Sequence, residues 1–66
     1  MNRIVVVSGG GTGMGRAIAR SFSRDGDRVV ILGRRQQVLV DASRDLNAGL
    51  PTEQVTWRAI DLSVPE

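Results

Sequence analysis

The segment 8–15, Ser-Gly-Gly-Gly-Thr-Gly-Met-Gly, constrains the fold of this chain more than any other feature. It directly follows the apolar run Ile4–Val7 and precedes a stretch with helical periodicity. Glycines allow a sharp turn and a close approach of a ligand to the backbone, because no Cβ stands in the way. A helix that follows such a loop directs free N–H groups and the positive end of its dipole at an anion. The segment therefore predicts a strand, a glycine loop and a helix that hold the phosphates of a nucleotide.

The rest of the sequence predicts three strands that alternate with two helices. We expect strands over 3–7, 28–32 and 54–60, and helices over 13–25 and 36–48. The strands are continuous apolar runs, which is typical of a parallel sheet covered on both faces. Right-handed crossovers between them predict an α/β fold, namely the first β-α-β-α-β half of a doubly wound, Rossmann-type parallel sheet.

Apolar positions recur at helical spacing and predict which side chains face the sheet. For the first helix they are Met14, Ala17, Ile18 and Phe22, and for the second Val38, Leu39, Ala42 and Leu46. Gly26 stands where a left-handed residue commonly ends a helix, and Gly49 stands where the second helix should stop.

Length and composition limit the possible functions. A chain of 66 residues forms at most one small domain, which is marginally stable alone because only about 60% of its surface is buried. The chain has no cysteine and no histidine, which excludes disulfides and the usual zinc sites, and we expect no metal site. Nine arginines oppose seven acids, but they are scattered and only two aromatic residues accompany them. We therefore expect a cytoplasmic protein with no nucleic-acid partner and no membrane partner.

Two well-known glycine motifs do not match the loop. The dinucleotide pattern G-x-G-x-x-G fails in either register of 8–15. The P-loop pattern fails because Arg16 and Ala17 stand where lysine and Ser/Thr would bind phosphate and magnesium. The loop does match T-G-x-x-x-G-x-G, with Ser8 in place of threonine.

With this motif and these strand spacings, the whole chain resembles the opening half of short-chain dehydrogenases/reductases. The resemblance implies that Gly9 permits the turn after the first strand. It also implies that the backbone at Gly11, Thr12, Gly13 and Met14 faces the pyrophosphate and the adjoining riboses of a nicotinamide cofactor. A glycine-rich turn without a ligand is the alternative.

Gly33, Arg34 and Arg35 follow the second strand. Folds that prefer NAD place an acid about 20 residues after the glycine loop, where it binds the ribose 2′-hydroxyl. Aligned with the family, Gly33 occupies that acid position and leaves space. A guanidinium at the next position can make two charge-assisted hydrogen bonds to a 2′-phosphate. The resemblance therefore implies NADP(H) as the cofactor, with NAD less favoured. The alternative is a pair of solvated arginines at a helix start.

Asp61 and Leu62 close the third strand. The resemblance implies that the Asp61 carboxylate accepts from the adenine amine and that the Leu62 N–H donates to a ring nitrogen. The alternative is a strand-end turn in which Asp61 caps the next helix. Ser63-Val64-Pro65-Glu66 has the spacing of a capping box, so we expect 1–66 to be the N-terminal part of one NAD(P)-binding Rossmann domain, truncated at the next helix.

The family's catalytic pair, Tyr-x-x-x-Lys, is absent, because 1–66 contains no tyrosine and no lysine. We expect no catalytic residue here. The resemblance implies the cofactor-binding portion of an NADP(H)-dependent oxidoreductase that interconverts a small carbonyl compound and an alcohol by hydride transfer, in a parent protein that forms a dimer or tetramer. The alternatives are a non-catalytic NADP-sensing protein of the same fold, and a short chain that assembles with a second copy. An NAD-using epimerase or dehydratase is less favoured, because such relatives generally have a different glycine spacing.

Overall fold

The computed structural model describes residues 3–9, 11 and 13–60. They form five elements, β1 (Ile4–Ser8), α1 (Gly13–Arg24), β2 (Arg28–Gly33), α2 (Gln36–Asn47) and β3 (Val55–Ala59). The order and type of the elements match the sequence-based prediction, and no boundary differs by more than one residue. The β-α-β-α-β unit is the first half of a Rossmann-type fold.

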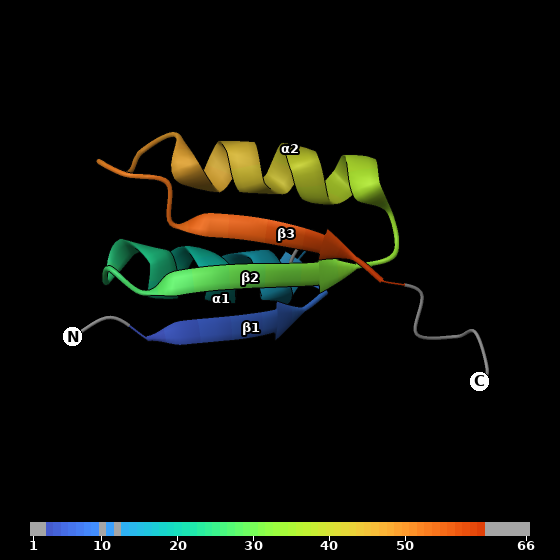
Figure 1. The fold of residues 1–66 in the computed structure, drawn as a ribbon, viewed down its shortest axis with the longest axis horizontal. Coiled ribbons are helices and arrows are strands. Elements are labelled where there is room, and N and C mark those ends of the chain that lie inside the picture. The colour runs from blue at the N-terminus through green and yellow to red at the C-terminus, as the bar shows by residue number, and fades with distance from the viewer. Residues whose placement is uncertain (1–2, 10, 12, 61–66) are drawn as a thin grey trace.

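The three strands form one parallel sheet with β2 in the middle (Figure 1). Across the sheet, Val7 of β1 pairs with Ile31 of β2, and Ile31 pairs with Trp57 of β3. Because the strands are parallel, their carboxyl ends lie at one edge of the sheet. The segment after β1 and the segment after β2, which are distant in sequence, therefore lie side by side.

Both helices lie on the same face of the sheet. Alternate strand residues form a single buried core with side chains from α1 and α2, and its members are Val7, Ala19, Val29, Ile31, Leu39, Ala42, Leu46 and Val55. Two right-handed crossovers that progress in one direction across a sheet place their helices on one side. Within the described ranges the opposite face is open, so the expectation of a sheet covered on both faces is not met there.

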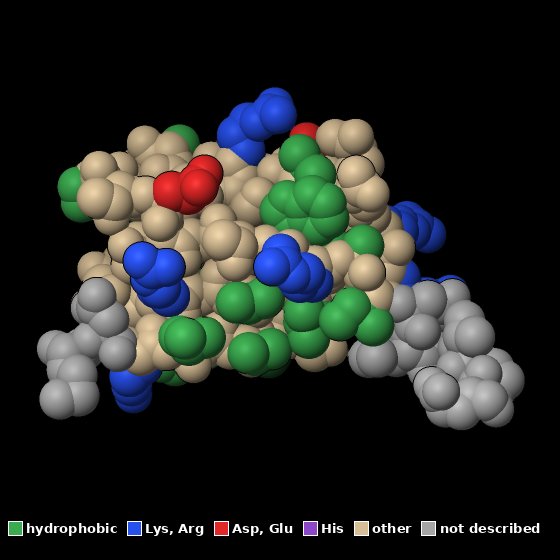
Figure 2. All heavy atoms as spheres, viewed as in Figure 1, with side chains coloured by type: hydrophobic (Ala, Val, Ile, Leu, Met, Phe, Trp, Pro, Cys, Tyr) green, Lys and Arg blue, Asp and Glu red, His purple; other side chains and the backbone are tan. Residues whose placement is uncertain are grey.

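The open face is apolar along β1. Ile4 and Val6 are 73% and 59% exposed, because their side chains alternate with the buried positions of the same strand. Figure 2 shows this face, with apolar side chains gathered over β1 and β2.

The predicted inner face of α2 is confirmed, whereas that of α1 is confirmed only at Phe22, which packs against the core. Leu39, Ala42 and Leu46 are buried, but in α1 the buried residues are Ala19 and Ser23. Met14 is 79% exposed, Ile18 is 40% exposed and Ala17 is also exposed. The row of α1 that contains Ala19 and Ser23 packs inward, because short side chains allow the helix backbone to approach β1 and β2. Helical spacing alone does not show which of two adjacent rows faces the sheet.

Side chains bind backbone groups at the amino end of the sheet. Asn47, at the end of α2, donates from Nδ2 to the Val55 carbonyl at 2.9 Å, and its Oδ1 accepts from the Gln54 and Val55 N–H groups at 2.9 Å. Gln54 donates from Nε2 to the carbonyls of Gly26 and Asp27 at 2.9 and 3.0 Å. These bonds join α2, the start of β3 and the α1–β2 turn. The turn contains Gly26 at φ +94°, which confirms the predicted left-handed residue.

Asp27 also binds Arg3, just before β1. Arg3 Nη2 donates to Asp27 Oδ2 at 2.9 Å, and the Arg3 backbone N–H donates to Oδ1 at 3.3 Å. The Arg3 guanidinium lies 5.6 Å from the centre of the Phe22 ring. The side-chain hydrogen bond from Arg3 holds the pKa of Asp27 below its ordinary value, although burial of the carboxylate opposes this shift.

Candidate nucleotide-binding site

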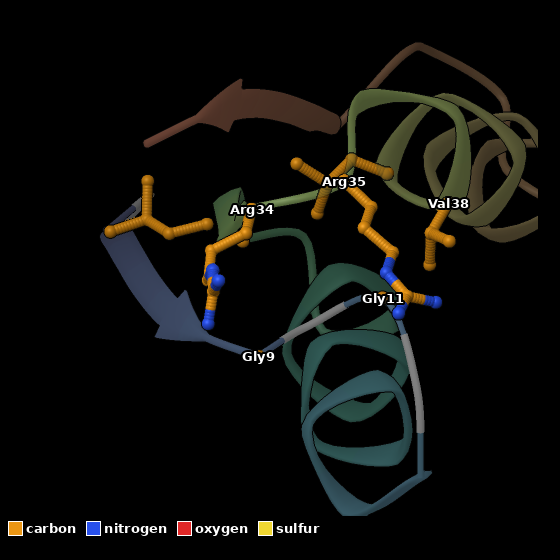
Figure 3. Close-up of a pocket in the computed structure, with 8 residues that line it drawn as sticks. Gly9, Gly11, Arg34, Arg35 and Val38 are labelled. Carbon is orange, nitrogen blue, oxygen red and sulfur yellow. The ribbon is translucent and has the colours of Figure 1, made fainter. Parts of the chain in front are cut away.

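A cavity of about 270 Å³ lies at the carboxyl edge of the sheet (Figure 3). Residues from the glycine loop, the end of β2 and the first turns of α2 line it, namely Gly9, Gly11, Leu32, Gly33, Arg34, Arg35, Val38 and Leu39. Five of them are residues that the sequence proposed for cofactor binding. The topology brings these residues together because two parallel strands end at the same edge.

Two loop glycines have backbone angles that favour glycine. Gly9 has φ +76° and Gly13 has φ +54°, and a Cβ built on either residue would meet no atom within 4 Å. The left-handed backbone explains the glycines, because other residues adopt it at a cost. The open space beside them leaves their backbone accessible to a ligand. Met14 begins the exposed side of α1 and does not line the cavity.

The other two lining glycines pack against α2. Gly11 is buried, and a Cβ on it would lie 2.7 Å from Val38 Cγ1. A Cβ on Gly33 would lie 3.1 Å from Leu39 Cδ2. The absent side chains therefore let the loop and the end of β2 approach the first turns of α2. Periodicity placed Val38 and Leu39 in the core but gave no signal that they also line the cavity.

Arg34 and Arg35 extend over the cavity from the segment that joins β2 to α2. Figure 3 shows the Arg34 side chain directed toward Gly9 and the Arg35 side chain directed toward Gly11. Arg35 is the N-cap residue of α2, makes no side-chain capping bond, and no acid stands in the first turn. Two cations beside a helix N-terminus raise the electrostatic energy of the protein, which a bound anion would lower.

A third arginine near the loop has a different role. Arg16 of α1 forms an ion pair with Asp45 of α2, and Arg20 lies 3.6 Å from the same carboxylate. Both arginines are thus directed toward α2 and do not line the cavity. This contact joins residues 29 positions apart, so no local pattern in the sequence indicated it.

The arrangement fits a phosphorylated nucleotide. It combines an open glycine backbone at Gly9, two guanidinium groups at one side, and apolar surface from the half-buried Leu32 and Val38. The remaining predicted contacts, Thr12, Asp61 and Leu62, lie outside the described residues, as does the predicted capping box at 63–66. In the described ranges no group of three or more carboxylate, cysteine or histidine side chains could hold a metal ion, and no helix there could cross a membrane.

A parallel sheet with a glycine loop and a cationic cavity at its carboxyl edge defines the first half of a dinucleotide-binding domain of the Rossmann type. Comparison with known families gives the particular class. The model of the family described as short chain dehydrogenase matches residues 3–66. The chain belongs to the short-chain dehydrogenase/reductase family, a family of oxidoreductases.

Individual proteins agree with this assignment. The short-chain dehydrogenase/reductase VdtF of Byssochlamys spectabilis is 40% identical over 47 residues, which is 71% of this chain and 15% of that protein. A crystal structure of a short chain dehydrogenase from Salmonella enterica serovar Typhi superposes with a TM-score of 0.88 at 30% identity, over 100% of this chain and 27% of the other. L-sorbose reductase from Gluconobacter frateurii, solved with NADPH and L-sorbose, gives a TM-score of 0.82 at 30% identity, over 91% of this chain and 22% of the other. The chain thus corresponds to a small part of its relatives.

Proposed function

We propose that residues 1–66 bind the adenosine end of NADP(H) in a cytoplasmic oxidoreductase that interconverts a small carbonyl compound and an alcohol by hydride transfer. The observation that carries this proposal is the segment 33–35. The resemblance to the family places Gly33 where an acid would bind the ribose 2′-hydroxyl, and Gly33, Arg34 and Arg35 line the same cavity. A 2′-phosphate would meet two cations there and no carboxylate from that position.

The similarity to L-sorbose reductase supports the choice of cofactor, because that relative was solved with NADPH. In our proposal Gly9 and Gly13 present an open backbone to the pyrophosphate, and Leu32 and Val38 supply apolar surface for adenine. The cofactor supplies the hydride. The chain's own residues bind and orient the adenosine end, and no tyrosine or lysine is present in 1–66 for the family's proton transfer. Assembly of the parent protein into a dimer or tetramer is part of the same proposal.

The test is a calorimetric titration of the intact protein with NADP⁺ and with NAD⁺. We expect NADP⁺ to bind more tightly, by about 10- to 100-fold, which corresponds to one hydrogen bond to a charged group. Arg34→Ala should remove most of this preference while changing NAD⁺ affinity little. Arg44→Ala is the matched control, because it removes the same charge from the last turn of α2, outside the cavity lining.

Equal affinity of the unaltered protein for the two cofactors would refute the proposed NADP preference. A preference that survives in both Arg34→Ala and Arg35→Ala would show that other residues read the 2′-phosphate. The proposed reaction is tested separately, by following NADPH oxidation by the intact protein with a panel of carbonyl compounds. NADP⁺ binding without any turnover would favour the sensing alternative over the enzyme.

A further inference from the structure

Gly11 differs from Gly9 and Gly13 in the reason for its missing side chain, and it makes a closer contact with α2 than Gly33 does. Gly9 and Gly13 have positive φ angles and open space around them. Gly11 is buried, and its φ angle lies outside the left-handed region, so a left-handed backbone does not explain this glycine. A Cβ there would lie 2.7 Å from Val38 Cγ1, well inside the 3.5–4.0 Å at which carbon atoms pack. A side chain at Gly11 is therefore excluded by the contact with α2.

Val38 has little freedom to avoid that contact. It lies in the first turn of α2, and a β-branched side chain in a helix has one strongly preferred χ1 rotamer. The Val38 backbone carbonyl carbon also lies 3.8 Å from the same Cβ position. A side chain at position 11 would therefore push the loop and the first turn of α2 apart by about 1 Å.

Such a displacement would reach the arginines directly. Arg35 is the N-cap residue of α2, and its side chain is directed toward Gly11. Arg34 precedes it in the same short connection and is directed toward Gly9. The distance between the glycine loop and the first turn of α2 therefore determines how far the guanidinium groups of Arg34 and Arg35 lie from the loop backbone.

We propose that the Gly11–Val38 contact determines cofactor specificity. It holds Arg34 and Arg35 at the distance from the loop backbone that lets one ligand place its 2′-phosphate at the arginines and its pyrophosphate at the loop. Gly11 and Val38 are positioning residues in this proposal, and they act through Arg34 and Arg35. The inference rests on the proposed NADP(H) function. It assigns to Gly11 a packing role in place of the direct pyrophosphate contact that the family motif implies.

The experiment is a double-mutant cycle in the intact protein, with NADP⁺ and NAD⁺ affinities measured by calorimetry. We expect Gly11→Ala to lower NADP⁺ affinity about tenfold and NAD⁺ affinity less than about threefold, because only NADP⁺ needs the guanidinium spacing. Val38→Ala removes Cγ1 and should restore the NADP⁺ preference in the Gly11→Ala background to within about threefold. Gly49→Ala is the matched control, because a Cβ there meets nothing within 4 Å and the residue lies beyond the far end of α2.

The outcomes separate this inference from the proposed function. If the unaltered protein shows no NADP⁺ preference, the proposed function fails. If it shows the preference and Gly11→Ala retains it, loses both cofactors equally, or is not rescued by Val38→Ala, the positioning inference is overturned. If Gly11→Ala prevents folding, Val38→Ile is the second variant. It adds a methyl group to Cγ1 and should also push the loop and α2 apart, in this case from the side of α2. A folded Val38→Ile protein with unchanged NADP⁺ preference would equally overturn the inference.

Discussion

The two ends of the parallel sheet are built from different contacts. At the amino end, the side chains of Asn47 and Gln54 bind backbone groups at 2.9 to 3.0 Å, which is about the ideal hydrogen-bond length. The Asp27 carboxylate accepts there from the Arg3 backbone N–H at 3.3 Å. At the carboxyl end, the loop glycines leave open space and two arginines extend over a cavity. One end has its polar groups bound within the chain, whereas the other presents backbone and positive charge at an opening.

This difference teaches where stability and binding reside. Side chains at the amino end satisfy the backbone groups that begin β3 and form the α1–β2 turn, so their loss leaves polar groups unpaired. In open parallel sheets, ligands bind outside the carboxyl ends of the strands. Substitutions at the two ends should therefore change different measured quantities.

The largest effect should come from placing valine at matched left-handed glycines. Gly13→Val and Gly26→Val both force a β-branched residue into positive φ, at +54° and +94°, which costs about 1–2 kcal/mol or more of stability. Of the two, only Gly13, the first residue of α1, lies at the carboxyl edge of the sheet. We expect Gly13→Val to weaken NADP⁺ binding by more than about 100-fold in calorimetry, and Gly26→Val to leave it nearly unchanged.

Gly13→Asn refines this test, because asparagine tolerates the left-handed region better than valine does. Retained binding in Gly13→Asn would assign the valine effect to backbone strain. Lost binding would assign it to the Cβ, which would then block the approach of the ligand. Equal loss of NADP⁺ affinity in Gly26→Val would contradict the division of roles between the two ends.

Asn47→Ala should give the largest loss of stability at the amino end. It removes three hydrogen bonds and leaves the N–H groups of Gln54 and Val55 without that partner. We expect a loss of about 3 kcal/mol in the free energy of unfolding, measured by urea denaturation, with an unchanged ratio of NADP⁺ to NAD⁺ affinity. Asn47→Asp retains the Oδ1 acceptor and should lose less. A changed cofactor preference in a folded Asn47→Ala protein would show that the ends are coupled.

The sequence predicted the fold well because its signals are local. Continuous apolar strands, helical spacing and Gly26 gave every element in the described ranges within one residue. The predicted inner face of α1 was right at Phe22 but wrong at Met14, Ala17 and Ile18, because Ala19 and Ser23, one residue further round the helix, pack closest to the sheet. Which of two adjacent rows is buried depends on the sheet beneath, which no single helix encodes.

The sequence predicted several residues of the candidate site but not the packing contacts between them. The motif and the segment after β2 identified Gly9, Gly33 and the arginine pair, which the cavity brings together. The packing of Gly11 on Val38 joins residues distant in sequence, so no local pattern predicts it. A glycine in the sequence also does not reveal whether it is there for a left-handed φ angle or for a close approach to another element. Only the spatial arrangement separates the two reasons.

Asp27→Asn should make stability less dependent on pH. The pKa of Asp27 is lower in the folded chain than its ordinary value of 3.8, chiefly through the hydrogen bond from Arg3, and its side chain is only 6% exposed. The stability from this pair is therefore present above the unfolded pKa and is lost as pH falls through the folded pKa. We expect Asp27→Asn to melt at a lower temperature than the unaltered protein at neutral pH, and the difference to narrow below pH 3.8. A constant difference across that range would show that the carboxylate charge contributes nothing.

The smallest effect should come from the ion pair between the two helices. Asp45 is exposed and accepts from Arg16 and lies near Arg20, so water and salt weaken the attraction. We expect Asp45→Asn to lower the free energy of unfolding by about 0.5 kcal/mol at low salt and by less at high salt. Asp41→Asn is the control, because Asp41 is an exposed acid on the same helix that accepts from Gln37 within α2. The contact belongs to neither end of the sheet, so cofactor preference should not change. A loss of NADP⁺ preference in Asp45→Asn alone would instead show that the spacing of α1 and α2 controls the cavity.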